Sequence, residues 1–189
     1  MIRIAVLGDI GSGKSYAAKQ FGYPVFNADD EVTKLYKKSR KCYYKLKKKL
    51  PNYITSFPVK KIELLKAIVA NHKNLKKIVK IIHPEIRNKM NDFIKKNRRK
   101  KLIILDIPLL IENKLNKKND ILIFINAKKK DINKRLKKRH YKRVKILKKF
   151  QLPVEVKKKK ADFIIENNFQ NNSVKKNVKR ILRKILLNA

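Results

Sequence analysis

The sequence contains little glycine, little cysteine and little acid, and it contains no tryptophan. Its 189 residues include four glycines, one cysteine and 14 aspartates and glutamates. A single cysteine, Cys42, excludes an internal disulfide framework and favours a reducing, cytoplasmic location. The three histidines, His72, His83 and His140, do not show the spacing of a zinc site.

Long apolar runs are also missing. The first run, Ile4–Leu7, has the length of a strand and leads into a glycine-rich loop, so we expect no secretory signal there. The longest later stretch, Leu102–Ile111, is interrupted by Asp106 and Pro108. We therefore expect neither a membrane segment nor a membrane partner.

Basic residues are in large excess, with 53 lysines and arginines and a formal net charge of +39. Such a charge is typical of proteins that bind nucleic acid. Here, however, lysine dominates over arginine, the charge is spread along the whole chain, and asparagine and isoleucine are also abundant. This pattern indicates an AT-rich coding sequence, so we favour a solvated surface and no dedicated nucleic-acid partner. A nucleic-acid-binding ATPase remains the less favoured alternative.

Apolar runs of strand length alternate with helix-length polar segments, which predicts an α/β fold with a doubly wound, five-stranded parallel sheet. The chain is long enough for one domain. The five expected strands are Ile2–Leu7, Pro24–Asn27, Leu102–Ile107, Ile121–Asn126 and Phe163–Glu166.

The segment Gly8–Ser15 reads Gly-Asp-Ile-Gly-Ser-Gly-Lys-Ser and follows the first expected strand, which is the order of a phosphate-binding P-loop. Glycines let backbone N–H groups converge on phosphates. Lys14 would reach the transferred phosphate and Ser15 would bind Mg²⁺. An ordinary glycine-rich turn is the alternative, but it would rarely need three of a chain's four glycines. The predicted ATP-binding residues are Gly8, Asp9, Ile10, Gly11, Ser12, Gly13, Lys14, Ser15 and Tyr16.

Two further segments are expected around the sheet. Residues 31–101 show helical patterns and predict a helical substrate-binding insertion, with a helix that starts at His83–Pro84. Its buried stripe would comprise Ile86, Met90, Phe93 and Ile94. Residues 135–151 form a basic segment typical of the lid of small kinases. The apolar spacing from Val174 to Ile185 predicts a packing helix.

A P-loop alone does not distinguish kinases, GTPases and other ATPases. The sequence lacks an Asn-Lys-x-Asp guanine signature, and it is shorter than a helicase or transport ATPase. A compact P-loop chain with a helical insertion and a basic lid has the plan of nucleoside-monophosphate-type kinases.

Several motifs together resemble the dephospho-CoA kinase family. Besides the P-loop, these are Asn27-Ala28-Asp29, His83-Pro84-Glu85-Ile86-Arg87, Pro108-Leu109-Leu110-Ile111-Glu112, Arg135 with Arg139, Gln151-Leu152-Pro153 and Ala161–Asn167. The resemblance implies a P-loop kinase fold and transfer of the γ-phosphate of ATP to the ribose 3′-hydroxyl of dephospho-CoA, the last step of coenzyme A synthesis. Another small-metabolite or nucleotide kinase is the alternative.

The resemblance also implies residue roles. Asp29 is the candidate catalytic base, with Asp30 as its local rival. Lys14, Arg135 and Arg139 would neutralise the transferring phosphoryl group, although the two arginines could also lie on a solvated helix face. The remaining implied positions are the acceptor-side residues His83, Arg87, Pro108, Leu109 and Glu112, the Mg²⁺ ligands Ser15 and Asp106, and the nucleotide-side Asn167. His83 could instead cap a helix.

The sequence departs from the family pattern in three places. Asn27 replaces the first acidic residue of Asp-Ala-Asp, Asn168-Phe169 stands where glycine often follows asparagine, and the lid is shorter than usual. We expect catalysis to survive the change at Asn27, because the proposed base is retained. We expect a monomer or a weak homo-oligomer.

Overall fold

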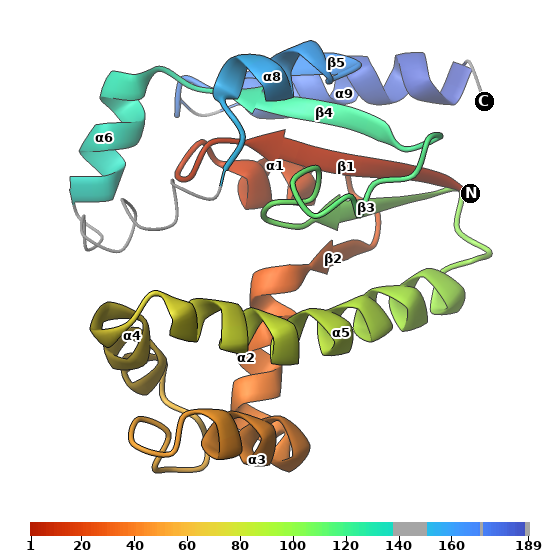
Figure 1. Cartoon of the computed structure of the whole chain (residues 1–189). Coiled ribbons are helices and arrows are strands. Elements are labelled where there is room, and N and C mark those ends of the chain that lie inside the picture. Colours follow the sequence, from red (N-terminus) through yellow and green to blue (C-terminus); the bar gives the residue numbers. More distant parts are fainter. Residues whose placement is uncertain (138–150, 171, 188–189) are drawn as a thin grey trace. The chain divides into compact units, whose positions relative to one another are not determined.

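The computed structural model describes residues 1–137, 151–170 and 172–187 (Figure 1). The chain divides into two compact units. The sheet unit comprises Met1–Asn27 and Asn97–Ala189, and the helical unit comprises Ala28–Lys96. In the described ranges, no helix combines the length and the apolar character needed to cross a bilayer.

The sheet unit is built on five parallel strands in the order β2-β3-β1-β4-β5. This confirms the predicted fold class and the approximate position of every predicted strand. Because all five strands run in the same direction, their carboxyl ends meet at one edge, where α/β proteins bind ligands. The strands are β1 (Ile2–Gly8), β2 (Val25–Asn27), β3 (Leu102–Asp106), β4 (Ile121–Asn126) and β5 (Phe163–Glu166).

One face of the sheet carries the main apolar core. Helices α1 (Lys14–Gln20) and α9 (Ser173–Leu187) pack there against alternate residues of the strands, such as Ile4 and Val6 of β1. The packing helix predicted at the C-terminal end is confirmed, and its buried residues are Val174, Val178, Ile181 and Ile185. Their spacing of three and four residues places them on one side of the helix.

Two further helices, α6 and α8, flank the sheet near the P-loop (Figure 1). Helix α8 (Val154–Lys159) contacts β1, and its Lys158 ammonium lies 5.9 Å from the ring centroid of Phe124. Since successive strand residues point to opposite faces, Phe124 lies on the face opposite Ile123 and the main core. Helix α6 (Lys129–Lys137) follows β4 and buries Ile132.

The helical unit consists of four helices, and its longest helix contacts the other three. These helices are α2 (Ala28–Lys38), α3 (Arg40–Lys49), α4 (Lys61–Ala70) and α5 (Lys73–Lys96). The buried side chains of α5 include Ile78, Ile82, Ile86 and Met90, which recur every four residues. This stripe supplies the apolar surface against which the unit packs.

The prediction that a helix starts at His83–Pro84 is wrong. Pro84 lies inside α5, and His83 is therefore neither at a helix start nor a capping residue. Proline removes one backbone N–H and disfavours a helix interior. The apolar spacing nevertheless continues through it, with Ile82 before and Ile86 after the proline, so burial of the stripe outweighs that local penalty.

Glu63 on α4 anchors the loop that precedes its own helix. Its Oε1 accepts hydrogen bonds from the N–H and hydroxyl groups of Thr55 and Ser56, and its Oε2 accepts one from the Lys60 N–H. Burial alone would raise the pKa of this carboxyl group, but these donors outweigh burial and lower the pKa below its ordinary value of 4.5. The helical unit thus uses its buried carboxylate for local structure.

Candidate active site

The P-loop joins the end of β1 at Gly8 to the start of α1 at Lys14. Gly13 is the N-cap residue of α1, with a φ of 93°, and it has no side chain that could cap the helix. The N-cap position therefore leaves the backbone N–H groups of the first turn accessible from its side. Such groups, together with the helix dipole, bind phosphate in many proteins.

Gly13 could not carry a side chain without disturbing the site. A Cβ atom there would overlap the Asn167 side-chain amide, and the positive φ would strain any other residue. At Gly8 a Cβ would come within 2.8 Å of the Ile125 carbonyl oxygen. The loop therefore owes its close fit to β4 and to the turn after β5 to the absence of side chains.

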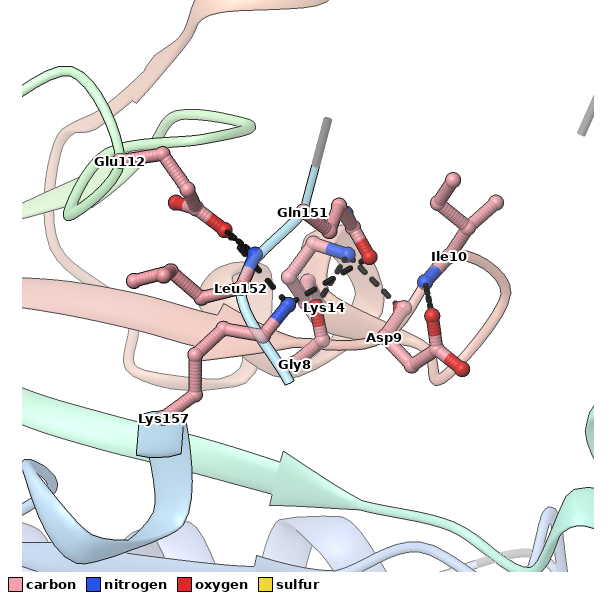
Figure 2. Close-up of polar contacts among 8 residues, drawn as sticks. All are labelled: Gly8, Asp9, Ile10, Lys14, Glu112, Gln151, Leu152 and Lys157. Carbon is pink, nitrogen blue, oxygen red and sulfur yellow. Dashed lines mark hydrogen bonds and ion pairs between the residues drawn. The ribbon is translucent and has the colours of Figure 1, made fainter. Parts of the chain in front are cut away.

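The Lys14 ammonium lies over the loop from which it projects (Figure 2). It donates hydrogen bonds to the carbonyl oxygens of Asp9 at 2.9 Å and Gly8 at 3.3 Å. The Asp9 carboxylate accepts a hydrogen bond from the Ile10 N–H at 2.7 Å, which fixes the loop's outer bend. A cation held beside the N-terminus of a helix is suited to a polyphosphate.

Asn167 ties the turn after β5 to the P-loop. Its backbone N–H donates to the Asn126 carbonyl at 2.7 Å, and its side-chain amide donates to the Ser12 carbonyl at 2.8 Å. Asn167 is buried, and so is Ser12, whose hydroxyl oxygen has no hydrogen-bond partner within the described part of the chain. Asn167, which we expected on the nucleotide side of the site, thus contacts the P-loop.

Arg135 on α6 lies beside the same turn. Its guanidinium carbon is 4.6 Å from the ring centroid of Phe169, a cation–π contact. Phe169 has a φ of 60°, a backbone conformation that glycine adopts without strain. Arg139, the second predicted lid arginine, lies outside the described residues, as do positions 138–150 of the lid.

Asp106 ends β3 and is buried at the carboxyl edge of the sheet. The Asn27 side-chain amide on neighbouring β2 donates a hydrogen bond to its Oδ2 at 2.7 Å. An aspartate at position 27 would instead place a second carboxylate there, so the asparagine lowers the local negative charge. Within the residues described, no three His, Cys, Asp or Glu side chains form a metal-binding group.

The segment after β3 carries the next predicted residues. Pro108 and Leu109 begin it, and Leu109 has a φ of 58°, a strained value for a residue of its size. Glu112 lies further along, and its Oε1 accepts a hydrogen bond from the Leu152 N–H at 3.0 Å (Figure 2). This bond connects two segments that are 40 residues apart.

Asp29, His83 and Arg87 belong to the helical unit. Asp29 and Asp30 lie in the first turn of α2, where a negative side chain interacts favourably with the positive end of the helix dipole. His83 and Arg87 lie one turn apart on α5. Burial, helped by the nearby Arg87 charge, lowers the pKa of His83 and favours the neutral imidazole.

Lys157 on α8 was not singled out in the sequence. Its ammonium is buried, lies 3.8 Å from Glu112 Oε1 and donates to Gln151 Oε1 at 3.4 Å (Figure 2). Because the chain has 53 basic residues, the presence of a lysine at a given position does not by itself indicate a functional residue. The helical spacing around Lys157 gives none either, because α8 has only six residues.

The chain is similar over almost its whole length to proteins of one family. The family model described as dephospho-CoA kinase matches residues 2–173. The dephospho-CoA kinase of Wolbachia pipientis wMel is 31% identical over 193 residues, covering 98% of this chain and 99% of that protein. The dephospho-CoA kinase of Bartonella quintana is 33% identical, with 98% of each chain covered.

A solved structure shows the same fold. TT1252 from Thermus thermophilus superposes with a TM-score of 0.76 at 25% identity, covering 99% of this chain and 97% of that one. The match therefore includes both the sheet unit and the helical unit. With a family model that spans nearly the whole sequence and relatives of matching length, this chain belongs to the dephospho-CoA kinase family.

Proposed function

We propose that this chain transfers the γ-phosphoryl group of ATP to the ribose 3′-hydroxyl of dephospho-CoA, giving coenzyme A and ADP. The observation that carries the proposal is the P-loop of the sheet unit, with Lys14 held at its carbonyl oxygens and Asn167 bonded to Ser12. Family membership supplies the acceptor. Both parts are needed, because a P-loop by itself accepts many phosphoryl-transfer reactions.

The nucleotide half of the reaction belongs to the sheet unit. Gly8–Ser15 would hold the triphosphate through backbone N–H groups, and the loop fits this group because its glycines leave no Cβ atoms in the way. Lys14 would exchange its carbonyl partners for phosphate oxygens and stabilise the charge on the transferring group. Arg135 and Arg139 would add positive charge from the lid, residues 135–151.

A magnesium ion fits the same site. Ser15, which carries a hydroxyl, is exposed at the start of α1, and Asp106 has a buried carboxylate at the end of β3. Mg²⁺ beside a polyphosphate takes only one or two protein oxygens, so a larger cluster of acidic side chains is not required. When bound, the ion would neutralise charge on the phosphates.

The acceptor half is assigned to the helical unit and to the segment after β3. Asp29 would orient the ribose hydroxyl and accept its proton as the phosphoryl group moves. His83 and Arg87 would contact the acceptor from α5, as Pro108, Leu109 and Glu112 would from the segment after β3. A neutral His83 can donate one hydrogen bond and accept another, whereas Arg87 supplies a fixed positive charge for an acceptor phosphate.

The remaining expectations concern the environment of the protein. Burial raises the pKa of the Cys42 thiol to about 11, which makes it a poor nucleophile and suits a reducing cytoplasm. We propose a monomer or a weak homo-oligomer. We propose no dedicated nucleic-acid partner, because family membership accounts for the P-loop without one.

The test is an ADP-release assay with ATP, Mg²⁺ and a panel of acceptors. Dephospho-CoA is expected to consume ATP and yield one coenzyme A per ADP, whereas AMP, CMP and shikimate are expected to give only background release. Release driven by one of those acceptors, or by added RNA at physiological salt, would contradict the proposal.

A further inference from the structure

Lys157 is an exception among the basic residues of the chain. Of the cationic side chains that the structure describes, only Arg3 and Lys157 are buried. Composition explains lysines on the surface, but it does not explain a buried one, because removing an ammonium from water is unfavourable unless nearby groups compensate. Lys157 therefore needs a local reason.

The two buried cations differ in their surroundings. Arg3 forms a close two-point pair with Asp120, with both N–O distances at 2.9 Å, where β1 begins. Among the described residues, Lys157 has no such tight partner, since Glu112 Oε1 lies at 3.8 Å and the Gln151 amide oxygen at 3.4 Å from its ammonium. The Lys157 ammonium instead bridges two acceptors from different segments, each at a longer distance than in the Arg3–Asp120 pair.

Two segments of the candidate site meet at this ammonium, close to the P-loop (Figure 2). Glu112 comes from the segment after β3, Gln151 precedes α8, and Asp9 of the P-loop is near enough for its charge to act on Lys157. Burial lowers the pKa of Lys157, and the Glu112 and Asp9 carboxylates oppose that shift. Only 4% of the Lys157 side chain is exposed, so substrate could not touch it in this arrangement.

We infer that Lys157 is a positioning residue, whose ammonium holds the Glu112 carboxylate and the Gln151 amide beside the phosphate-binding loop. Glu112 also accepts the Leu152 N–H, so its carboxylate is fixed from two directions. Through Glu112, Lys157 sets the geometry of the segment after β3. The inference rests on the proposed acceptor-side role of Glu112.

The test uses Lys157→Met, Lys157→Arg and Glu112→Gln, with Lys159→Met as the matched control. Lys159 is an exposed lysine on the same short helix. Steady-state kinetics with dephospho-CoA varied at saturating ATP, and then the reverse, would separate the two substrates. Lys157→Met is expected to lower kcat/KM for dephospho-CoA by about tenfold to a hundredfold. KM for ATP should stay within about twofold of its original value.

The double variant Lys157→Met/Glu112→Gln separates positioning from a purely structural pair. Removing both charges should restore much of the melting temperature that Lys157→Met loses, since no unpaired carboxylate is left in the site. The defect with dephospho-CoA should remain and should equal that of Glu112→Gln alone. If the double variant recovers the original kinetics, the pair is only structural and the inference is wrong.

The conservative variant covers the case in which Lys157→Met fails to fold. Lys157→Arg keeps the charge and should retain most of the activity with dephospho-CoA, so a defect as large as that of Glu112→Gln would overturn the inference. Failure of the proposed function looks different. In that case the unaltered protein does not phosphorylate dephospho-CoA, whereas failure of the inference leaves the unaltered protein active.

Discussion

The sheet unit and the helical unit differ in where they bury polar side chains. In the sheet unit, Ser12, Asp106, Lys157 and Asn167 are buried at or beside the segments that follow strands. Each of these residues interacts with one that is far away in sequence, as in the bonds from Asn167 to Ser12 and from Asn27 to Asp106 and the ion pair of Lys157 with Glu112. The helical unit buries Glu63 and Asn74, and both bond to residues close in sequence.

This difference determines which part of the candidate site is held in shape before a ligand binds. Polar groups that are already cross-linked hold a site in shape before substrate arrives, and they need little reorganisation when it binds. Two of the candidate residues of the helical unit are more accessible to water, since Arg87 is exposed and His83 is only half-buried. We therefore expect the nucleotide to bind a preformed site in the sheet unit, while the acceptor residues depend on dephospho-CoA for their final arrangement.

The largest effect is expected from Lys14→Met. The change removes the cation that would stabilise the transferring group, and kcat should fall by about 10²–10³ or more. Lys19→Met, at an exposed position near the end of the same helix, should leave kcat unchanged. Steady-state turnover of dephospho-CoA measures both. Similar kcat values for the two variants would show that the sheet unit does not supply the central charge.

Asp29→Asn tests the helical unit. Loss of the proposed base should lower kcat by about 10²-fold or more, whereas the affinity for ATP should remain that of the unaltered protein. Asp30→Asn, one residue along the same helix turn, is the matched control. The measurements are kcat and the dissociation constant of an ATP analogue. A full defect in Asp30→Asn together with an active Asp29→Asn would reassign the base.

Gly13→Ala and Gly22→Ala sharpen the comparison further. Both glycines have positive φ, at 93° and 73°, so each substitution should destabilise the protein by roughly 1–2 kcal/mol. Only at Gly13 would the new Cβ displace Asn167, since nothing lies within 4 Å at Gly22. Urea unfolding should therefore give comparable losses, while nucleotide binding weakens in Gly13→Ala alone. If both variants bind the nucleotide equally well, the position of Asn167 does not matter for nucleotide binding.

The smallest effect concerns Glu63. Glu63→Gln should destabilise the protein by about 1–2 kcal/mol at neutral pH, because charged hydrogen bonds become neutral ones. The folded pKa of Glu63 lies below 4.5, so its contribution is complete above pH 4.5 and is lost as the pH falls through the folded pKa. Urea unfolding at several pH values should show the difference from the unaltered protein shrinking in acid. The exposed Asp92→Asn on α5 provides the control.

The sequence predicted the sheet well because its strands are short apolar runs that end at glycine or polar residues. The P-loop could also be predicted from the sequence, since three of the four glycines lie within it. Pro84 misled the helix assignment, because a local rule about proline was followed while the apolar repeat from Ile78 to Met90 extends through it. Tertiary packing decided that helix.

Contacts between distant residues could not be predicted in the same way. The asparagine at position 27 was read as the loss of one charge, but its hydrogen bond to Asp106 depends on the pairing of β2 with β3. Lys157 was missed because its burial, not its identity, distinguishes it from the other lysines. The roles of the individual site residues stay predictions until variants are measured.

Titration calorimetry with a non-hydrolysable ATP analogue and Mg²⁺ tests the preformed nucleotide site most directly. Without dephospho-CoA, the unaltered protein and Asp29→Asn should bind the analogue with the same affinity, and Gly13→Ala should bind it more weakly. An absence of binding heat in the unaltered protein, or binding that appears only once dephospho-CoA is added, would contradict the account.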